Sequence, residues 1–381
     1  MTGLAHFVLL LGSAFGPAEA PARSDEISPL AAHRLSQRAF RIAAGRIEPA
    51  VVTIETIGGA LPPSEQAGGR PPGRGGFQLA DGPTTGLVYR ADGLILTSSF
   101  NFVRDPSVVT VTLADGRQFV ASLVARDEIN RLAMLRIDAD GLVVPVWCPQ
   151  EAVQVGTWAL ALGRGFGGEG PAVSVGIISA VGRFEGGAVQ TDAKLSPGNY
   201  GGPLVDLQGR VIGVCVPLGP DGGEMAGVSL YDSGVGFAVP AWRIAAVGAR
   251  LAQGESVQPG KIGVLIQNAV PEGVRISGVA RDSGAAEAGL ETDDVILAVD
   301  GESVADRTEL LRRMARRAAG ETIRLDLLRG AKKLSRTVTL RARSEIRGLP
   351  EGPAAPPPPA SQPASQPASQ PSTQPQRRPG S

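Results

Sequence analysis

Short apolar runs separated by turn residues fill the chain from Gly86 to about Pro240, and this pattern constrains the fold more than any other feature. Runs such as "GLVYRADGLILTSS", "SVVTVTLADGRQFVASLVA" and "RVIGVCVPL" break into strand-length, largely β-branched segments. Asp92-Gly93, Asp115-Gly116 and Gln208-Gly209 mark tight turns. Because no long helical stretch interrupts the series, the pattern predicts an antiparallel sandwich or barrel. The 51 Gly, 31 Pro and only 4% aromatic residues agree with many short strands and frequent turns.

The first twenty residues, "MTGLAHFVLLLGSAFGPAEA", predict a secretory signal peptide. The run from Phe7 to Phe15 is apolar, and Ala18-Glu19-Ala20 fits a cleavage site of small residues. The start carries no Lys or Arg, and Pro21 would follow the cut, so cleavage itself is left open. The apolar run is too short to span a membrane, and the sequence holds no other candidate span. We therefore expect export to the periplasm or cell envelope.

Helical spacing follows the signal, between residues 29 and 48. There Leu35, Phe40, Ile42 and Ile47 are predicted to share much of one helical face. The chain then switches to the β-branched run "PAVVTIETIG", which predicts a strand, and to a Gly/Pro-rich loop.

After residue 250 the pattern changes to strands that alternate with helices, which predicts a second, α+β domain. The predicted strands are Ile262–Ile266, Val274–Ala280, Val295–Val299, Ile323–Leu327 and Ser335–Leu340, and the predicted helices are Ala285–Leu290 and Arg307–Ala318. The longer helix directs Leu310, Leu311 and Met314 inward. Beyond it, repeated Pro-Ala-Ser-Gln units lack the apolar residues that offset ordering entropy, so residues 346–381 are predicted to be disordered.

Charge is balanced over the whole chain and uneven along it. The sequence has 37 basic and 37 acidic residues, yet residues 307–347 hold 13 Lys or Arg and 4 Asp or Glu. We interpret this stretch as a solvated Arg-rich face, with an anion-binding surface as the alternative. No specific nucleic-acid partner is predicted.

Two cysteines, Cys148 and Cys215, are present. Cys215 lies in an apolar strand, where a buried inert thiol is expected. In an exported protein the two thiols can pair, and the sequence leaves that alternative open. Neither a Cys-x-x-Cys motif nor a His/Cys cluster is present, so no metal or cofactor is predicted.

Two motif runs resemble a known family. The run "QTDAKLSPGNYGGPL", with "GLILTSSF" before it and "GVGFAVP" after it, resembles the trypsin-like domain of the HtrA/Deg proteases. The runs "GKIGV" and "SGAAEAGLETDDVILAVDGESV" resemble the PDZ domain that follows it in that family. Together the motifs cover about residues 45–345 in the family's order.

The resemblance implies a mainly β fold with two six-stranded barrels followed by an α+β PDZ domain. The predicted divisions are a signal peptide over 1–20, an N-terminal helical segment over 21–45, the trypsin-like double barrel over 46–250, the PDZ domain over 258–345 and a disordered tail over 346–381.

The family carries a Ser-His-Asp triad in the cleft between its barrels. At the matching positions this chain has Phe100 for the histidine, Arg131 for the aspartate and Tyr200 for the serine. We expect these three side chains to lie close together, with Arg131 over an aromatic face. The resemblance also implies an oxyanion hole built from the backbone N–H groups of Gly198 and Tyr200, which do not depend on the side chain.

The histidine content bears on the same cleft. The only two histidines are His6, in the predicted signal peptide, and His33, in the N-terminal helical stretch. Neither is expected inside a barrel, and an unactivated tyrosine hydroxyl has a pKa of about 10. Asp127 is expected to be a turn residue, and Asp192 a structural part of the motif.

In the PDZ-like domain the family's carboxylate-binding loop matches "GKIGV". The resemblance implies that backbone N–H groups around Ile262, Gly263 and Val264 hold the C-terminal carboxylate of a peptide. The peptide would add as a strand beside the helix that carries Leu310, Leu311 and Met314.

The function predicted from these residues is a proteolytically inactive HtrA-like protein, hence not an enzyme, that binds polypeptides or C-terminal peptides as a scaffold, adaptor or chaperone. The alternative is an active serine-type endopeptidase with atypical catalytic residues, and a third interpretation is a structural envelope protein. The resemblance further implies a homotrimer built through N-terminal segments.

Overall fold

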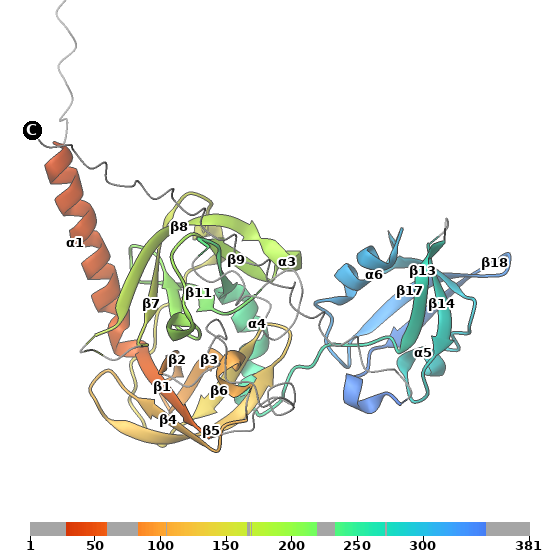
Figure 1. Ribbon diagram of the computed structural model, residues 1–381, viewed down its shortest axis with the longest axis horizontal. Helices are drawn as coiled ribbons and strands as arrows, with labels where there is room; N and C mark the ends of the chain where they lie inside the picture. The colour runs from red at the N-terminus through yellow and green to blue at the C-terminus, as the bar shows by residue number, and fades with distance from the viewer. Residues whose placement is uncertain are drawn as a thin grey trace, which may run out of the picture.

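The computed structural model describes residues 28–58, 83–103, 105–165, 168, 170–218, 233–270 and 273–347. The predicted signal peptide and nearly all of the predicted tail lie outside these residues. Figure 1 shows two adjoining barrels, a helix that projects from them, and a smaller domain beside them.

The N-terminal helix, α1 (Pro29–Ile47), begins at Ser28, whose hydroxyl accepts a hydrogen bond from the Ala31 N–H. Its last turns pack on the barrels through Phe40 and Ile47. The predicted single apolar face is wrong, because Leu35 and Ile42 are 55% and 44% exposed. At 3.6 residues per turn these two residues point away from Phe40 and form a second stripe.

The first barrel closes in the strand order β1-β2-β3-β6-β5-β4. Its strands are β1 (Val51–Ile57), β2 (Thr84–Arg90), β3 (Leu94–Ser98), β4 (Val108–Thr112), β5 (Gln118–Asp127) and β6 (Leu132–Arg136). A short 3₁₀ turn, η2 (Ser99–Phe102), follows β3 and turns the chain toward the second barrel. Gly93 allows the β2–β3 hairpin, because a side chain there would collide with the Ile137 carbonyl and its φ is 88°.

The second barrel closes in the order β10-β11-β12-β9-β8-β7. Its strands are β7 (Trp158–Gly163), β8 (Ala172–Gly182), β9 (Ala188–Thr191), β10 (Pro203–Val205), β11 (Val211–Cys215) and β12 (Gly236–Pro240). A one-turn helix, α3 (Arg183–Gly186), connects β8 to β9, and α4 (Ala241–Ala252) follows β12 and packs back on both barrels. The predicted double β-barrel is therefore confirmed.

The C-terminal domain is a sheet in the order β13-β14-β15-β17-β18, with β16 paired to β15. Its elements are β13 (Val264–Val270), β14 (Gly273–Val279), α5 (Gly284–Glu287), β15 (Val295–Val299), β16 (Glu302–Ser303), α6 (Arg307–Met314), β17 (Thr322–Arg329) and β18 (Lys332–Thr339). Helix α6 ends four residues earlier than predicted. Ala318 leaves the helix because it forms a β-bridge with Pro259, and the Ala319 N–H bonds the Gln258 carbonyl.

Specific contacts join the C-terminal domain to the barrels. Val257, in the connecting segment, pairs with the end of β5 through bonds of 2.8 Å to the Arg126 carbonyl and 2.9 Å from the Glu128 N–H. Arg316 reaches from the C-terminal domain and donates to the Asn130 Oδ1 at 2.9 Å and to the Phe184 carbonyl at 2.8 Å. One arginine therefore binds both barrels at once.

Candidate functional site

The cleft between the barrels is filled by aromatic packing. Phe100 comes from η2 of the first barrel and Tyr200 from the turn before β10, and both are at most 4% exposed. Their rings meet edge to face. Arg131 lies close by: its carbonyl accepts the Ser99 N–H at 2.9 Å, and it lines a cavity of about 50 Å³ together with Phe100. The stacking of Arg131 on an aromatic ring stays a prediction.

Hydrogen bonds within the turn that carries Tyr200 stabilise its conformation. The 3₁₀ turn η4 (Pro197–Asn199) precedes it, and the Ser196 hydroxyl donates to the Asn199 Oδ1 at 2.8 Å. The Tyr200 N–H donates to the Pro197 carbonyl at 3.1 Å. That N–H is thus already satisfied inside the turn, so an oxyanion hole formed with Gly198 requires this bond to open. The oxyanion hole stays a prediction.

The first barrel also fixes this turn. The Thr85 hydroxyl donates to the Gly198 carbonyl at 2.6 Å and accepts the Arg164 N–H at 2.7 Å. The Tyr200 carbonyl accepts the Thr85 N–H at 3.3 Å. Strand β2 therefore binds the turn at the main-chain carbonyls of Gly198 and Tyr200, which are present whatever the side chain at position 200.

Asp127 and Asp192 both have structural roles. The fully buried Asp127 carboxylate accepts the backbone N–H groups of Ile129 and Asn130 and, at 2.5 Å, the Asn130 side chain. Burial raises the pKa of Asp127, and these hydrogen bonds oppose the rise. Asp192 accepts the Ile177 N–H at 2.6 Å.

Histidine lies outside the barrels in the described part of the chain. His33 is exposed on α1, where its ring Nε2 is 2.8 Å from the side-chain nitrogen of Gln37. It belongs to the helix that projects from the barrels (Figure 1). The second histidine of the sequence, His6, is not among the described residues.

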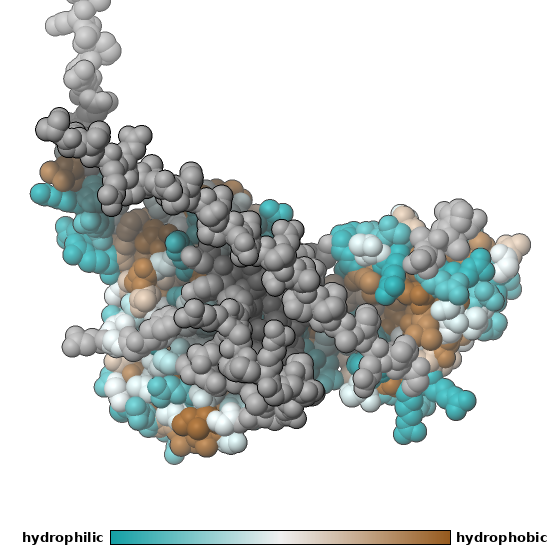
Figure 2. All heavy atoms as spheres, in the orientation of Figure 1, coloured by the Kyte–Doolittle hydropathy of each residue, from teal (hydrophilic) through white to brown (hydrophobic). Residues whose placement is uncertain are grey.

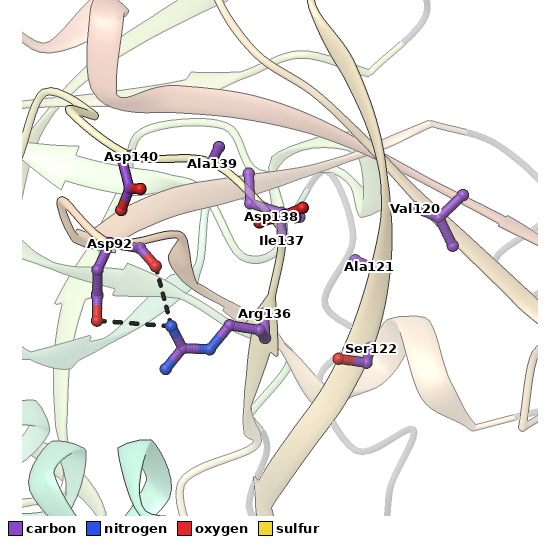
Figure 3. Close-up of a pocket in the computed structure, with 9 residues that line it drawn as sticks. All are labelled: Asp92, Val120, Ala121, Ser122, Arg136, Ile137, Asp138, Ala139 and Asp140. Carbon is purple, nitrogen blue, oxygen red and sulfur yellow. Dashed lines mark hydrogen bonds and ion pairs between the residues drawn. The ribbon is translucent and has the colours of Figure 1, made fainter.

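A cavity of about 520 Å³ lies on the first barrel, away from this cleft. Figure 3 shows its polar lining, in which the Arg136 guanidinium donates to the Asp92 carbonyl at 2.9 Å and lies 3.5 Å from the Asp92 carboxylate. Asp138 and Asp140 line it as well. The described residues contain no His/Cys/Asp/Glu group arranged to hold a metal ion.

A groove of about 170 Å³ lies between β13 and α6 of the C-terminal domain. Its lining residues are Pro259, Gly260, Lys261, Ile262, Gly263, Val264, Ile266, Leu310, Leu311, Met314 and Ala315. All six residues predicted to bind peptide are therefore brought together in one largely apolar groove. Figure 2 shows apolar surface bordered by hydrophilic surface on this domain.

The backbone at one end of the groove has N–H groups that the domain itself does not use. The Ile262 and Gly263 carbonyls point into the domain, because they accept the N–H groups of Ala285 and Ala280 at 3.0 and 2.9 Å. Neither Ile262 nor Gly263 donates its own N–H to any acceptor among the described residues. Gly263 has a φ of 87°, and a side chain there would collide with Ser283.

Strand β13 leaves one edge of the sheet unpaired beside the groove. It is the terminal strand of the sheet and pairs only with β14 within the described residues. Its other edge is therefore open beside α6, so a peptide has backbone groups to pair with along the groove.

Two family models match the chain: the trypsin-like peptidase domain over residues 84–214 and the PDZ domain over residues 254–340. A protein of Synechocystis named as the serine protease HhoA is 34% identical over 288 residues, covering 68% of this chain and 70% of that protein. A DegP-like protein of Brucella suis, named as a periplasmic serine endoprotease, is 35% identical over 283 residues. That match covers 69% of this chain but 53% of the relative, so the chain spans about half the length of the DegP-like relative.

Solved structures of proteases are also similar to this chain. The serine endoprotease from Yersinia pestis is 29% identical with a TM-score of 0.58, covering 79% of this chain and 97% of that one. The HtrA-type protease AlgW with a decapeptide is 28% identical with a TM-score of 0.59, covering 82% and 99%.

These names contradict the prediction that the chain is not an enzyme, because the relatives and the similar structures are named as serine proteases or endoproteases. That prediction rested on the residues at positions 100, 131 and 200 and on the expectation that neither histidine of the sequence lies inside a barrel.

One further finding concerns membranes: no helix among the described residues is both long and apolar enough to cross a bilayer.

Proposed function

This chain belongs to the HtrA/DegP-type trypsin-like serine proteases that carry a C-terminal PDZ domain, and we propose on that premise that it binds the free C-termini of polypeptides in the groove between β13 and α6. The observation that carries the proposal is the pair of unused N–H groups at Ile262 and Gly263, next to an apolar groove and an open strand edge.

The chemistry follows from these parts. A terminal carboxylate accepts the two N–H groups, and charge-assisted hydrogen bonds of this kind are stronger than neutral ones. The terminal side chain fills the apolar groove against Leu311 and Met314, and the peptide backbone pairs with β13. An internal polypeptide segment lacks the carboxylate, so this site distinguishes chain ends.

Titration of the purified full chain with a peptide of apolar C-terminus, and with the same peptide amidated, tests the proposal. Amidation removes the charge that the loop holds, so we expect at least tenfold weaker binding, equivalent to about 1.4 kcal/mol. Leu311→Ala should weaken binding of the acid, whereas Val120→Ala, which truncates an exposed side chain on the first barrel, should not. Equal affinity for acid and amide would reject the carboxylate site.

A second candidate function is serine-type endopeptidase activity of the double barrel, which the names of the relatives favour. The turn before β10, which carries Tyr200, supports this candidate because hydrogen bonds fix its backbone conformation. Any catalytic groups of this chain must differ from the family's triad, because Phe100, Arg131 and Tyr200 stand at the three triad positions.

Cleavage of casein by the purified chain, with labelling by a fluorophosphonate, tests this candidate. Tyr200→Phe keeps the buried ring and removes only the hydroxyl, and Tyr89→Phe, on β2, is the matched control. Cleavage that disappears in Tyr200→Phe alone places the hydroxyl in the chemistry. Absence of both cleavage and labelling in the unmodified chain would reject the candidate.

We also propose that the protein is exported and trimeric. The periplasmic name of the DegP-like relative supports export. A groove of about 350 Å³ between α1 and β8, lined by Phe40, Val173 and Val175 among others, supports assembly through the N-terminal helix. Figure 2 shows apolar surface beside this helix. Sedimentation of the unmodified chain as a monomer at all concentrations would contradict the trimer.

A further inference from the structure

We propose that helix α1 binds the surface of anionic lipid bilayers through the side that faces away from the barrels. Two rows of side chains form this outer face: the apolar row Leu35 and Ile42, and the basic row Arg34, Arg38 and Arg41. The contact is independent of the peptide groove and of the cleft between the barrels.

The apolar row is left uncovered by the rest of the protein. Leu35 and Ile42 are 55% and 44% exposed. They are seven residues apart, so they lie on one side of the helix. Ile42 is two residues from Phe40, which packs on the barrels, and residues at that spacing do not face the same way. Large apolar side chains in water on a projecting helix are typical of an interaction surface.

The basic row adjoins the apolar one. Arg34, Arg38 and Arg41 are spaced four and three residues apart, so they follow one another along the helix. Arg38 is also three residues from Leu35 and four from Ile42, which brings the two rows together. All three arginines are exposed, and none forms an ion pair or side-chain hydrogen bond with the described residues. Their charges are therefore open to an external anion.

Helix α1 has no negative charge of its own. It carries four arginines and no acidic residue. The fourth, Arg46, donates to a barrel carbonyl at 3.1 Å and belongs to the inner side. Glu48 follows the helix and lies 3.6 Å from Arg164. Asp25 and Glu26 precede the helix in the sequence and lie outside the described residues. The outer face itself is thus positive without a compensating carboxylate.

A bilayer surface matches both rows at once. Phosphates of anionic lipids attract arginines, and the acyl chains just below them accept apolar side chains. A second copy of the helix would bring its arginines against Arg34, Arg38 and Arg41 without a carboxylate to pair with them. A nucleic acid or other soluble polyanion would neutralise the arginines but leave Leu35 and Ile42 in water. The two rows together therefore favour an anionic bilayer.

The position of α1 leaves room for such a surface. Figure 1 shows its first turns extending beyond the barrels, and Figure 2 shows mainly hydrophilic surface over this projecting part. The groove between α1 and β8 lies on the Phe40 side and is bordered by Arg41. Leu35 and Ile42 are not among its lining residues, so they stay accessible when that groove is occupied.

The expected affinity depends on charge and salt. One basic residue close to an anionic surface contributes about fivefold, equivalent to about 1 kcal/mol. Loss of the three arginines should therefore weaken binding by about 100-fold at low salt. Salt shortens the range of these attractions, so binding should weaken steeply as its concentration rises.

Co-sedimentation of the purified full chain with lipid vesicles tests the inference. Vesicles of phosphatidylglycerol and phosphatidylcholine in equal parts should bind at least about tenfold more tightly than phosphatidylcholine alone. The triple variant R34Q/R38Q/R41Q should lose this preference. Glutamine has nearly the helix propensity of arginine, and circular dichroism checks that α1 still forms.

A matched variant removes the same charge elsewhere. R324Q/K332Q/K333Q changes three exposed cations of β17 and β18 and should bind anionic vesicles as the unmodified chain does. All variants keep residues 1–20, so any contribution from the predicted signal peptide is common to them.

The apolar row needs its own test. L35Q/I42Q keeps the charges and should weaken binding to anionic vesicles by at least about tenfold, because two apolar side chains no longer enter the interface. An environment-sensitive dye on Leu35→Cys should shift its emission to shorter wavelength with anionic vesicles, but not with heparin. The two natural cysteines are buried, so the dye labels the new one.

Every outcome bears on the proposal. Equal binding to anionic and neutral vesicles overturns its electrostatic basis. Loss of binding in R324Q/K332Q/K333Q but not in R34Q/R38Q/R41Q assigns the contact to the Arg-rich C-terminal face and overturns the role of α1.

Two further results reject the lipid partner. Unchanged binding in L35Q/I42Q, or the same dye shift with heparin, identifies a site for soluble polyanions instead. Absence of binding to every vesicle at low salt overturns the inference and leaves the proposed peptide binding untouched.

Discussion

Phe100 and Tyr200 meet edge to face across the boundary of the two barrels, with ring centroids 5.4 Å apart and an interplanar angle of 74°. One ring comes from the turn after β3 and the other from the turn before β10. Both belong to the same buried cluster as Ile178 and Leu204 of the second barrel. The contact therefore links the two barrels where the family places its cleft.

Phe100→Ala should destabilise the double barrel by about 3–5 kcal/mol, because it removes a buried aromatic side chain and its contact with the Tyr200 ring. Urea unfolding followed by tryptophan fluorescence measures the change. Val120→Ala, at a side chain 75% exposed, is the control and should change the free energy of unfolding by less than about 0.5 kcal/mol. A loss below about 1 kcal/mol in Phe100→Ala would show that the ring contact contributes little.

Arg316→Ala should loosen the C-terminal domain from the barrels. The variant removes the bonds to Asn130 and Phe184, and Gly187 leaves the room that the guanidinium occupies. We expect a larger radius of gyration in small-angle X-ray scattering and faster proteolysis of the segment near Val257. Arg312→Ala, whose partner Glu309 lies on the same helix, should alter neither. Unchanged scattering in Arg316→Ala would mean that other contacts position the domain.

Both cysteines are free and buried in the structure, which settles the pairing that the sequence leaves open. Burial raises the pKa of Cys215 to about 12 and also raises the pKa of Cys148. Neither thiol should react with Ellman's reagent at pH 8 while the protein is folded, and two per chain should react in guanidinium chloride. Rapid reaction of the folded protein, or absence of titratable thiols after unfolding, would contradict this.

The pair Asp294–Arg329 should make the C-terminal domain sensitive to acid. The Asp294 side chain is fully buried, and Arg329 lies 2.7 Å from it. Burial alone would raise the pKa of Asp294, but the hydrogen bonds from Arg329 and the Glu291 N–H together hold it below the usual value of an aspartate. The carboxylate thus contributes stability above its unfolded-state pKa, and this contribution is lost as the pH falls through the lower folded-state value.

Arg329→Ala leaves the Asp294 charge buried without its partner and should cost about 3 kcal/mol at pH 7. The cost should shrink as the pH falls and Asp294 becomes protonated in both proteins. Arg324→Ala, at an exposed pair with Asp326, is the control and should cost less than about 1 kcal/mol. Thermal unfolding at several pH values measures both variants; a cost independent of pH would exclude the charge of Asp294 as its cause.

Much of the fold follows from local sequence signals. Alternating apolar runs and Gly turns predict the strands of both barrels, because side-chain period and turn chemistry act over a few residues. Helical spacing likewise predicted Met314, and the resemblance of "GKIGV" to the family's loop implied Ile262. The likeness of the motif run around Tyr200 to a known family supplied the pairing of the two barrels.

Contacts between distant segments were decided only by the tertiary structure. The sequence predicts α6 through Ala318, but Ala318 pairs with Pro259 instead. It predicts one apolar face of four residues on α1, but of these only Phe40 and Ile47 pack on the barrels. It gives no signal for the bond of Arg316 to Asn130, which lies 186 residues away. Helical and strand periodicity is a property of neighbouring residues, whereas these partners meet only after both barrels close and the C-terminal domain packs beside them.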